Sequence, residues 1–376
     1  MSYLTNENAL ALLNDLVKLP SYIGASNPDA ENLVGEYLKN WIKRNLSGYE
    51  LVGIAYGKKR RNLLYKTAVS KILFACHMDT VPTEKRELKL KIEGDNVYGL
   101  GTKDMKGGIV SMLLALKEIQ NIGIKNSASI LFYGDEEYAQ AGMRKLVTES
   151  ENIPKPTLII SPESRFNIGY GARGVCVVKF SILGKTAHSA RPHLGIDAIQ
   201  LFYKVYSVLC KKLSKKTLLG KSVVTLTELT GGLMINGKLS SQANMIPNYA
   251  AGVISIRLAQ MDILSENIEK IIRGTVTDSG SKIENFEILN DYPAFIGSKK
   301  ILKPITSALR KNGLEVNLAD PNLAGYNDAA LLANKLNVPI INFGPYGENN
   351  HSPDEWVSIQ SILDTAKVYV SLIKDL

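Results

Sequence analysis

The sequence has few of the residues that build disulfide frameworks or cysteine-based zinc sites. Its 376 residues include only three cysteines, Cys76, Cys176 and Cys210, which are far apart and lie in apolar segments. Disulfide-rich secreted domains and zinc-binding modules instead carry several cysteines at short, regular spacings. We therefore expect neither kind of site, and a reducing compartment such as the cytoplasm.

Long hydrophobic runs and a secretion signal are also missing. No apolar stretch approaches the roughly 20 residues that a membrane-spanning helix needs. Residues 1–17 contain no basic segment and no cleavage signal of the kind that opens a secreted precursor. From these absences we expect no membrane partner.

Acidic residues are outnumbered, although only moderately. The chain carries 45 Lys and Arg against 36 Asp and Glu, which gives a formal net charge of +9. Basic runs at 58–61 and 211–216 contain no interleaved aromatic residues, and no nucleic-acid-binding motif is recognisable. We interpret these runs as solvated surface and expect no nucleic-acid partner.

Hydrophobic periodicity predicts an α/β chain in two parts. Over residues 1–174 and 290–376, predicted helices alternate with short buried strands, which is typical of helices covering a mostly parallel sheet. The second helix is expected to open at 27–29, and a charged hairpin-like segment is expected at 84–98. Residues 175–289 follow the order strand, helix, strand, strand, helix, strand, which is the ferredoxin-like arrangement. The chain is therefore expected to leave one domain, build a second and return.

The predicted strand at 71–76 ends in His77 and Asp79, and the expected site is organised around it. Open α/β sheets bind their ligands at the carboxyl ends of the strands. A histidine there can ligate a metal, while the aspartate fixes the ring through the other nitrogen. Taken alone, the triplet is more readily explained as polar residues that close a strand.

Further carboxylates and an imidazole follow other predicted strands or open a predicted helix. These residues are Asp104, Glu136, Glu137, Glu163 and His351. Such side chains are ligands for zinc, cobalt or manganese. Two histidines and three carboxylates can hold two ions if one carboxylate bridges them. The extra glutamate beside a ligand can then carry a proton.

Each residue also has a simpler interpretation. Asp104 could cap the following helix or belong to a turn, and the pair Glu136 and Glu137 could be a solvated helix N-terminus. Glu163 and His351 could lie on the surface. All of these simpler interpretations would have to be correct at the same time, at one strand end after another. The joint pattern therefore favours a metal site.

Six segments, in this order, resemble the acetylornithine deacetylase / succinyl-diaminopimelate desuccinylase family: ACHMDTVP, GLGTKDMKGG, GDEE, SPES, GKTAHSARPHLGIDAI and GPYGENNHSPDEW. These proteins are di-zinc deacylases and carboxypeptidases, and the resemblance covers nearly the whole chain. It implies a di-zinc exopeptidase-like three-layer catalytic domain. The inserted ferredoxin-like α+β domain would be the dimerisation domain.

The resemblance also implies which residues hold the metals. His77 and Glu163 would bind one ion, Glu137 and His351 the other, and Asp104 would bridge the two. A cis peptide bond would follow Asp104. The ions are expected to be zinc, with cobalt or manganese as alternatives.

Other roles follow from the same resemblance. Asp79 would orient the preceding histidine, and Glu136 would be the general acid and base. His188 would reach the site of a partner subunit and polarise the oxyanion, while Asn244 and Arg257 would bind the α-carboxylate of the substrate. Without the resemblance, the last three could be a turn residue, a loop amide and a solvated arginine.

We therefore expect a homodimeric enzyme that hydrolyses the amide bond of an N-acyl amino acid, of the N-acetylornithine or N-succinyl-diaminopimelate type. A hydroxide bridging the metals would attack, and Glu136 would shuttle the proton. A carboxypeptidase or dipeptidase on the same scaffold is the nearest alternative. A binding protein that has kept the fold without activity is another, but the complete ligand set argues against it.

Overall fold

The computed structural model describes residues 2–22, 29–82, 88–240 and 242–376. The predicted start of the second helix at 27–28 and part of the predicted hairpin-like segment, 84–87, lie outside these ranges. The chain forms two compact units. The first unit comprises Met1–Tyr170, Gly297–Asp320 and Asn327–Leu376, and the second comprises Gly171–Ile296 and Pro321–Tyr326. The second unit thus contains the expected insert, 175–289, and adds a few residues at each end together with a short later segment.

The helices and strands of the first unit alternate along the chain. They are α1 (Asn6–Val17), α2 (Glu31–Asn45), β1 (Glu50–Ala55), β2 (Arg61–Lys66), β3 (Ile72–His77), β4 (Lys91–Glu93), β5 (Asn96–Tyr98), η1 (Thr102–Lys106), α3 (Gly107–Asn121), β6 (Ala128–Tyr133), α4 (Ala141–Thr148), η2 (Ser150–Asn152), β7 (Leu158–Ser161), α7 (Lys299–Lys311), α8 (Ala329–Leu336), β15 (Ile340–Asn342), β16 (Gly347–Glu348), β17 (Trp356–Ser358) and α9 (Ile359–Asp375).

The central sheet of this unit has the strand order β1-β2-β6-β3-β7-β15. Strands β6, β3, β7 and β15 run parallel, and β2 and β1 continue the sheet in antiparallel fashion. Every residue of β3 and β6 is buried. Strands that are apolar and buried on both faces are expected in a parallel sheet with helices on each side.

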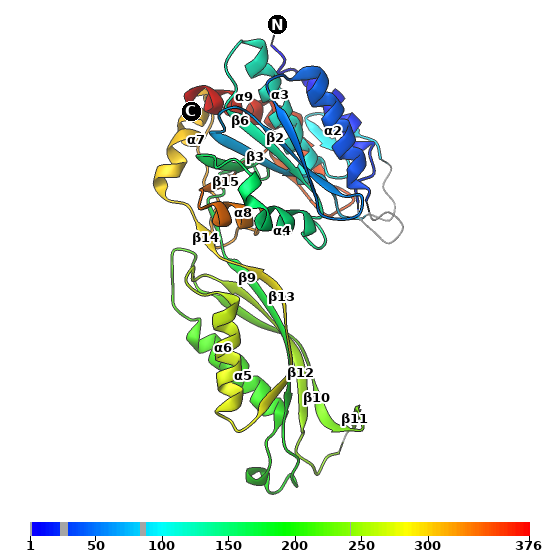
Figure 1. Cartoon of the computed structure of the whole chain (residues 1–376), viewed down its shortest axis with the longest axis vertical. Helices are drawn as coiled ribbons and strands as arrows, with labels where there is room; N and C mark the ends of the chain where they lie inside the picture. The colour runs from blue at the N-terminus through cyan, green and yellow to red at the C-terminus, as the bar shows by residue number, and fades with distance from the viewer. Residues whose placement is uncertain (1, 23–28, 83–87, 241) are drawn as a thin grey trace. The chain divides into compact units, whose positions relative to one another are not determined.

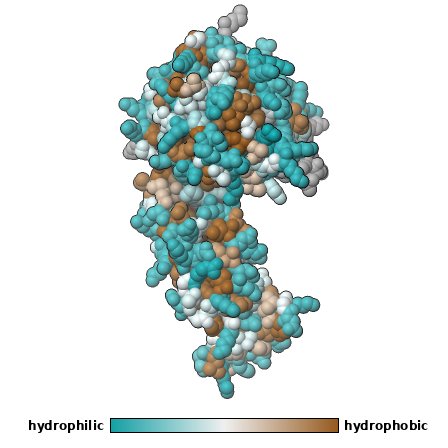
Figure 2. All heavy atoms as spheres, in the orientation of Figure 1, coloured by the Kyte–Doolittle hydropathy of each residue, from teal (hydrophilic) through white to brown (hydrophobic). Residues whose placement is uncertain are grey.

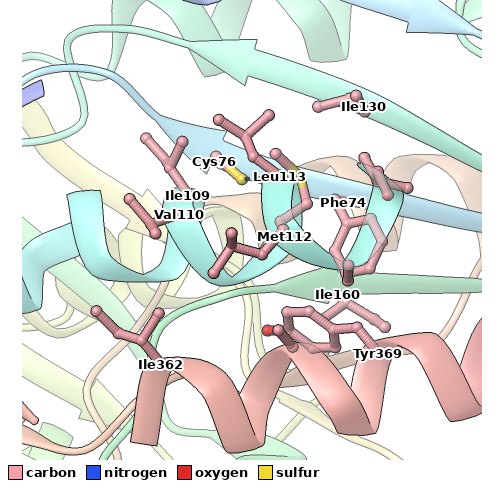
Figure 3. Packing of buried hydrophobic residues seen from close by; sticks show 14 of the residues in the cluster. Phe74, Cys76, Ile109, Val110, Met112, Leu113, Ile130, Ile160, Ile362 and Tyr369 are labelled. Atoms are coloured by element: carbon pink, nitrogen blue, oxygen red, sulfur yellow. Dashed lines mark hydrogen bonds between the residues drawn. The ribbon is translucent and has the colours of Figure 1, made fainter. Parts of the chain in front are cut away.

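Helices cover both faces of this sheet (Figure 1). Phe74 of β3 and Ile160 of β7 point toward α3 and α9, where they meet Met112 and Tyr369 (Figure 3). The Phe74 and Tyr369 rings pack edge to face, with centroids 4.9 Å apart. The next residue of β3, Leu73, is also buried, and because side chains alternate along a strand it faces the side of α4 and α8. The predicted α/β class is confirmed.

A second, small sheet brings the C-terminal part of the chain beside the turn that carries Asp104. Its strand order is β16-β17-β5-β4. Strands β17 and β5 are antiparallel, and Trp356 lies opposite Tyr98. The residues just before Trp356 therefore lie next to those just after Tyr98.

The second unit is an antiparallel sheet with helices packed on it (Figure 1). Its elements are β8 (Gly171–Ala172), β9 (Gly174–Leu183), η3 (Pro192–Leu194), α5 (Ala198–Lys212), β10 (Val223–Ile235), β11 (Lys238–Ser240), β12 (Tyr249–Leu258), α6 (Ser265–Thr277), β13 (Lys282–Tyr292) and β14 (Phe295–Ile296). The order β11-β10-β12-β9-β13 contains the ferredoxin-like order of strands. Phe180 of β9 stacks on Phe202 of α5, with ring centroids 4.4 Å apart.

Hydrophilic and hydrophobic side chains are interspersed over the visible face of each unit (Figure 2). Single exposed apolar residues, such as Tyr203 and Leu218, are common on soluble surfaces. Among the residues that the structure describes, none of the helices combines the length and the apolar character that a membrane span requires.

Candidate metal centre

The candidate ligands lie where neighbouring parallel strands end. His77 is the last residue of β3, and Glu136 and Glu137 follow β6. Glu163 follows β7, and His351 lies in the β16–β17 loop, within the longer connection that follows β15. Because β6, β3, β7 and β15 are adjacent in the sheet, these loops meet at its carboxyl edge, where ligands bind in folds of this class.

Asp104 is delivered by the turn η1, which precedes α3. Its backbone is not helical, with φ −124° and ψ 91°, and the Asp104–Met105 peptide bond is cis, as the resemblance implied. The N-cap residue of α3 is Lys106, so Asp104 does not cap the helix. Its Oδ1 instead lies 3.0 Å from His77 Nε2, and its Oδ2 accepts a hydrogen bond from Asn350 Nδ2 at 3.2 Å.

Three overlapping groups of side chains are each close enough to hold an ion. They are His77, Asp104 and Glu163; Asp104, Glu137 and His351; and His77, Glu136 and Glu137. Within each group the ligand atoms lie within 4.8 Å of one another. The first two groups share Asp104, which is the arrangement that a bridging carboxylate requires.

The orientation of His77 is set by Asp79, but through its main chain. His77 Nδ1 lies 3.0 Å from the carbonyl oxygen of Asp79 and 3.8 Å from its carboxylate Oδ1. An Nδ1–H donated to that carbonyl leaves the Nε2 lone pair free for a metal. The carboxylate of Asp79 has a different contact, since its Oδ2 accepts the main-chain N–H of Glu137 at 3.0 Å.

Three further contacts fix the outer candidate ligands. His351 Nε2 lies 3.1 Å from Glu137 Oε1 and 3.4 Å from Asp104 Oδ2. Asn327, at the start of the segment that leads into α8, donates through Nδ2 to Glu163 Oε2 at 2.8 Å. The second ligand group is therefore assembled from three separate loops, and Glu163 is held from a fourth.

The electrostatics of the site indicate more negative charge than the protein itself compensates. Burial raises the pKa of Glu163 and raises that of Asp79 to about 6. Burial, followed by the nearby Asp328 carboxylate, raises the pKa of Glu136 well above its usual value. Asp104 differs, because hydrogen bonds from His351 and then His77 overcome the effect of burial and hold its pKa well below the usual range.

Divalent cations would compensate this charge. Buried carboxylates without a counter-charge are costly, and the oxygen and imidazole donors present are those that zinc, cobalt and manganese accept. The residues of this edge therefore fit a pair of divalent ions.

Sequence patterns did not reveal two residues that support the site. Asn350 lies directly before His351, and Glu355 lies four residues after it in a loop that is rich in polar residues throughout. Asp328 is buried at the N-cap position of α8, and its side chain makes no capping hydrogen bond.

The remaining predicted residues, His188, Asn244 and Arg257, belong to the second unit. Ser189 N–H donates to the Asn244 carbonyl at 2.9 Å, so His188 and Asn244 are on neighbouring loops. Arg257 lies near the end of β12, whose first residue is Tyr249. At about 3.3 Å per residue, roughly 26 Å separates these two positions. Within one chain, Asn244 therefore lies before the start of β12, and Arg257 lies near its far end.

Comparison with known proteins identifies one family and several relatives of this chain. The sequence model described as peptidase family M20/M25/M40 matches residues 73–375. An uncharacterized metallohydrolase of Methanocaldococcus jannaschii is 27% identical over 98% of this chain and 99% of its own. The succinyl-diaminopimelate desuccinylase of Ruthia magnifica is 26% identical over 81% of this chain and 83% of its own. The acetylornithine deacetylase of Buchnera aphidicola is 26% identical over 81% of this chain and 80% of its own.

Solved structures show the same fold. The aminopeptidase PepT of Bacillus cereus matches with a TM-score of 0.76 at 20% identity, over 100% of this chain and 99% of that chain. A dinuclear metal-binding peptidase of Bacillus subtilis matches with a TM-score of 0.68 at 17% identity, over 98% of this chain and 97% of that chain. Both matches extend over the two units described above.

Proposed function

Because the chain belongs to peptidase family M20/M25/M40 and is a metallohydrolase, we propose that it hydrolyses the amide bond of an N-acyl amino acid. The observation that carries this proposal is the sharing of Asp104 by two ligand groups. The acyl amino acid as substrate is supported by the resemblance and by relatives named succinyl-diaminopimelate desuccinylase and acetylornithine deacetylase.

The donor set supports two divalent ions, zinc or alternatively cobalt or manganese. We assign His77 and Glu163 to one ion, Glu137 and His351 to the other, and Asp104 to both. Ions held there would lower the pKa of water and polarise the acyl carbonyl. The protein contributes the fixed geometry, through the carbonyl of Asp79 on one ligand and Asn327 on another.

Glu136 is the residue that we assign to proton transfer. It is not needed as a ligand in the two groups that share Asp104, yet it is adjacent in sequence to one member, Glu137. Its carboxylate accepts a proton from the attacking water as the new C–O bond forms. It returns that proton to the amide nitrogen as the C–N bond breaks, so the products are a carboxylate and a free amine.

We further propose that the active form is a homodimer joined through the second unit. His188 and Asn244 lie beyond one end of β12, and Arg257 lies near the other. If all three contact one bound substrate, two copies of the chain are required. In this arrangement His188 polarises the carbonyl in the site of the partner.

A hydrolysis panel tests the proposal. Chelated protein is reloaded with zinc or cobalt and offered N-acetyl amino acids, N-succinyl amino acids and unblocked dipeptides. The proposal expects metal-dependent release of amine from the acylated substrates. Faster hydrolysis of the dipeptides would assign the same centre to peptide hydrolysis, and no metal-dependent hydrolysis of any substrate would overturn the proposal.

A further inference from the structure

We propose that Glu355 is a positioning residue that holds the turn carrying Asp104 in the shape that lets its carboxylate be shared by two ions. The inference rests on the proposed function, because it takes Asp104 to be a metal ligand. Glu355 is separated from Asp104 by 251 residues. It is only 1% exposed, so it has no access to substrate and acts through the turn.

Four main-chain N–H groups of the turn donate to this one residue. Glu355 Oε2 accepts from Gly101 at 2.8 Å. Its Oε1 accepts from Lys103 at 2.9 Å and from Asp104 at 3.0 Å. Its main-chain oxygen accepts from Gly99 at 3.2 Å. Three of these four donors therefore converge on one carboxylate, as main-chain N–H groups do in anion-binding nests.

The turn needs such an acceptor because of its own conformation. Gly101 has a φ of +73°, and neither Asp104 nor Met105 is helical. N–H groups at the start of a helix also have no acceptor within the helix. Since Gly101, Lys103 and Asp104 are buried, water does not replace the missing partners, and the carboxylate of Glu355 does.

The position of Glu355 is fixed by strand pairing. Trp356, the next residue, lies opposite Tyr98 in the β17–β5 pair. The bond from Gly99 N–H to the Glu355 carbonyl continues that pairing by one residue. Two strand ends thus hold the carboxylate against the turn.

The same loop also touches the side chain of Asp104. Asn350 Nδ2 donates to Asp104 Oδ2 at 3.2 Å, and His351 Nε2 lies 3.4 Å from that oxygen. One segment therefore fixes the main chain of Asp104 through Glu355 and its carboxylate through Asn350. Outer groups that orient a ligand in this way typically change metal affinity by about 10-fold to 100-fold.

Buried Lys106 complements the charge of Glu355. Burial lowers the pKa of Lys106 to about 7, and attraction to Glu355 acts in the opposite direction. Its Nζ also donates to the Leu19 carbonyl at 3.3 Å. Lys106 is thus a buried basic side chain whose positive charge is attracted to the carboxylate of Glu355.

The test compares Glu355→Gln, Glu355→Asp and the control Asp354→Asn. A glutamine has the same shape but one oxygen, so at least one N–H of the turn faces its NH2 group. Asp354 is the exposed neighbour, and Asp354→Asn removes one negative charge at almost the same place. The readouts are ion affinity by chelator competition, and the visible spectrum of the cobalt-loaded protein.

We expect Glu355→Gln to bind the ion pair at least about 10-fold more weakly and to change the cobalt spectrum. Glu355→Asp should fall between it and the wild type, and Asp354→Asn should match the wild type. Leu302→Ala, a core truncation in α7, serves as a destabilised control that should keep wild-type ion affinity. If Glu355→Gln does not fold, the ion affinity and spectrum of Glu355→Asp, compared with those of the two controls, decide whether Glu355 has the proposed role.

The outcomes separate the two proposals. A wild-type protein that binds no ion pair overturns the proposed function, and this inference with it. A wild-type protein that binds two ions, with Glu355 variants of unchanged affinity and spectrum, overturns the role of Glu355 alone. Equal losses in Leu302→Ala and Glu355→Asp would also overturn it, because general destabilisation would then explain both.

Discussion

Neighbouring carboxylates of the metal centre differ in what we expect them to do. Glu136→Ala should keep both ions and lose nearly all turnover, by at least about 100-fold, because it removes the proton carrier and no ligand. Glu137→Ala should lose affinity for one ion. Metal content by elemental analysis, together with kcat, distinguishes the two variants. An active Glu136→Ala protein would remove the proposed role.

Removing the ions should destabilise the protein, because the carboxylates gathered at the sheet edge then lack their counter-charges. A ligand at 100 times its Kd stabilises the folded state by about 2.7 kcal/mol per site. We therefore expect the Tm to fall on chelation and to rise again with zinc concentration. Magnesium, which keeps its waters and prefers oxygen ligands, is the control. A Tm that is insensitive to zinc would contradict the fit argued for the donor set.

Several of the candidate ligands could be predicted from the sequence because they follow short apolar runs, and strand ends converge in parallel sheets. His77 and Glu163 are of this kind. Glu355 could not be recognised in this way, since its role depends on Trp356 pairing with Tyr98. Asp79 was expected to contact His77 through its side chain, but the contact is made by its main-chain carbonyl. Because every residue has such a carbonyl, a sequence pattern cannot reveal this contact.

Strand β6 ends in a turn that a buried ion-pair network supports. Asp135, which precedes Glu136, has a φ of +69°, and its Oδ1 lies 2.9 Å from Arg60 Nη2. Arg60 Nε also lies 2.5 Å from Glu31 Oε1. Both carboxylates are almost fully buried, at 1% and 0% exposure, so this arginine compensates two charges at once.

Arg60→Leu should therefore cost about 3–5 kcal/mol of unfolding free energy, since it leaves buried carboxylates unpaired. The neighbouring Arg61 is exposed, and Arg61→Leu should stay within about 0.5 kcal/mol of the wild type. Urea unfolding of both variants measures the difference. Equal unfolding free energies for Arg60→Leu and Arg61→Leu would mean that the ion-pair network does not stabilise the turn.

The longer helices and strands were predictable, and the shortest ones were not. Strands such as β3 and β6 are continuous apolar runs, and the helix-like periodicity of α9 extends over several turns. Strands β5 and β17 have three residues each, too few to show a period. Strand β10 runs from Val223 to Ile235, although Gly231 and Gly232 interrupt the alternation of residue types without ending the strand.

The division into two units was visible in the sequence as a change in pattern. Continuous apolar runs give way after about residue 174 to alternating strands, of which β9 and β12 are examples. Alternation is typical of an antiparallel sheet with one covered face. The short segment Pro321–Tyr326 of the second unit was not anticipated, because Tyr326 joins this unit through an aromatic stack on Tyr292, with centroids 5.3 Å apart.

Whether two chains build each active site can be tested by mixing inactive variants. His188→Ala removes a group that we expect to act in the partner's site, and Glu136→Ala removes one that acts in its own. A mixed dimer then has one site with both residues intact. If subunits exchange freely, the mixture should recover about a quarter of wild-type activity, since half of the dimers are mixed and each has one working site.

Each variant alone supplies the baseline, and light scattering confirms that both remain dimers. A mixture that stays as inactive as its components, although mass spectrometry shows mixed dimers, would place His188 in the site of its own chain. The separation of Asn244 and Arg257 at opposite ends of β12 argues against that outcome, because the two residues of one chain are then too far apart to contact one substrate. The assay therefore examines the dimer and the shared site together, without requiring the natural substrate to be known.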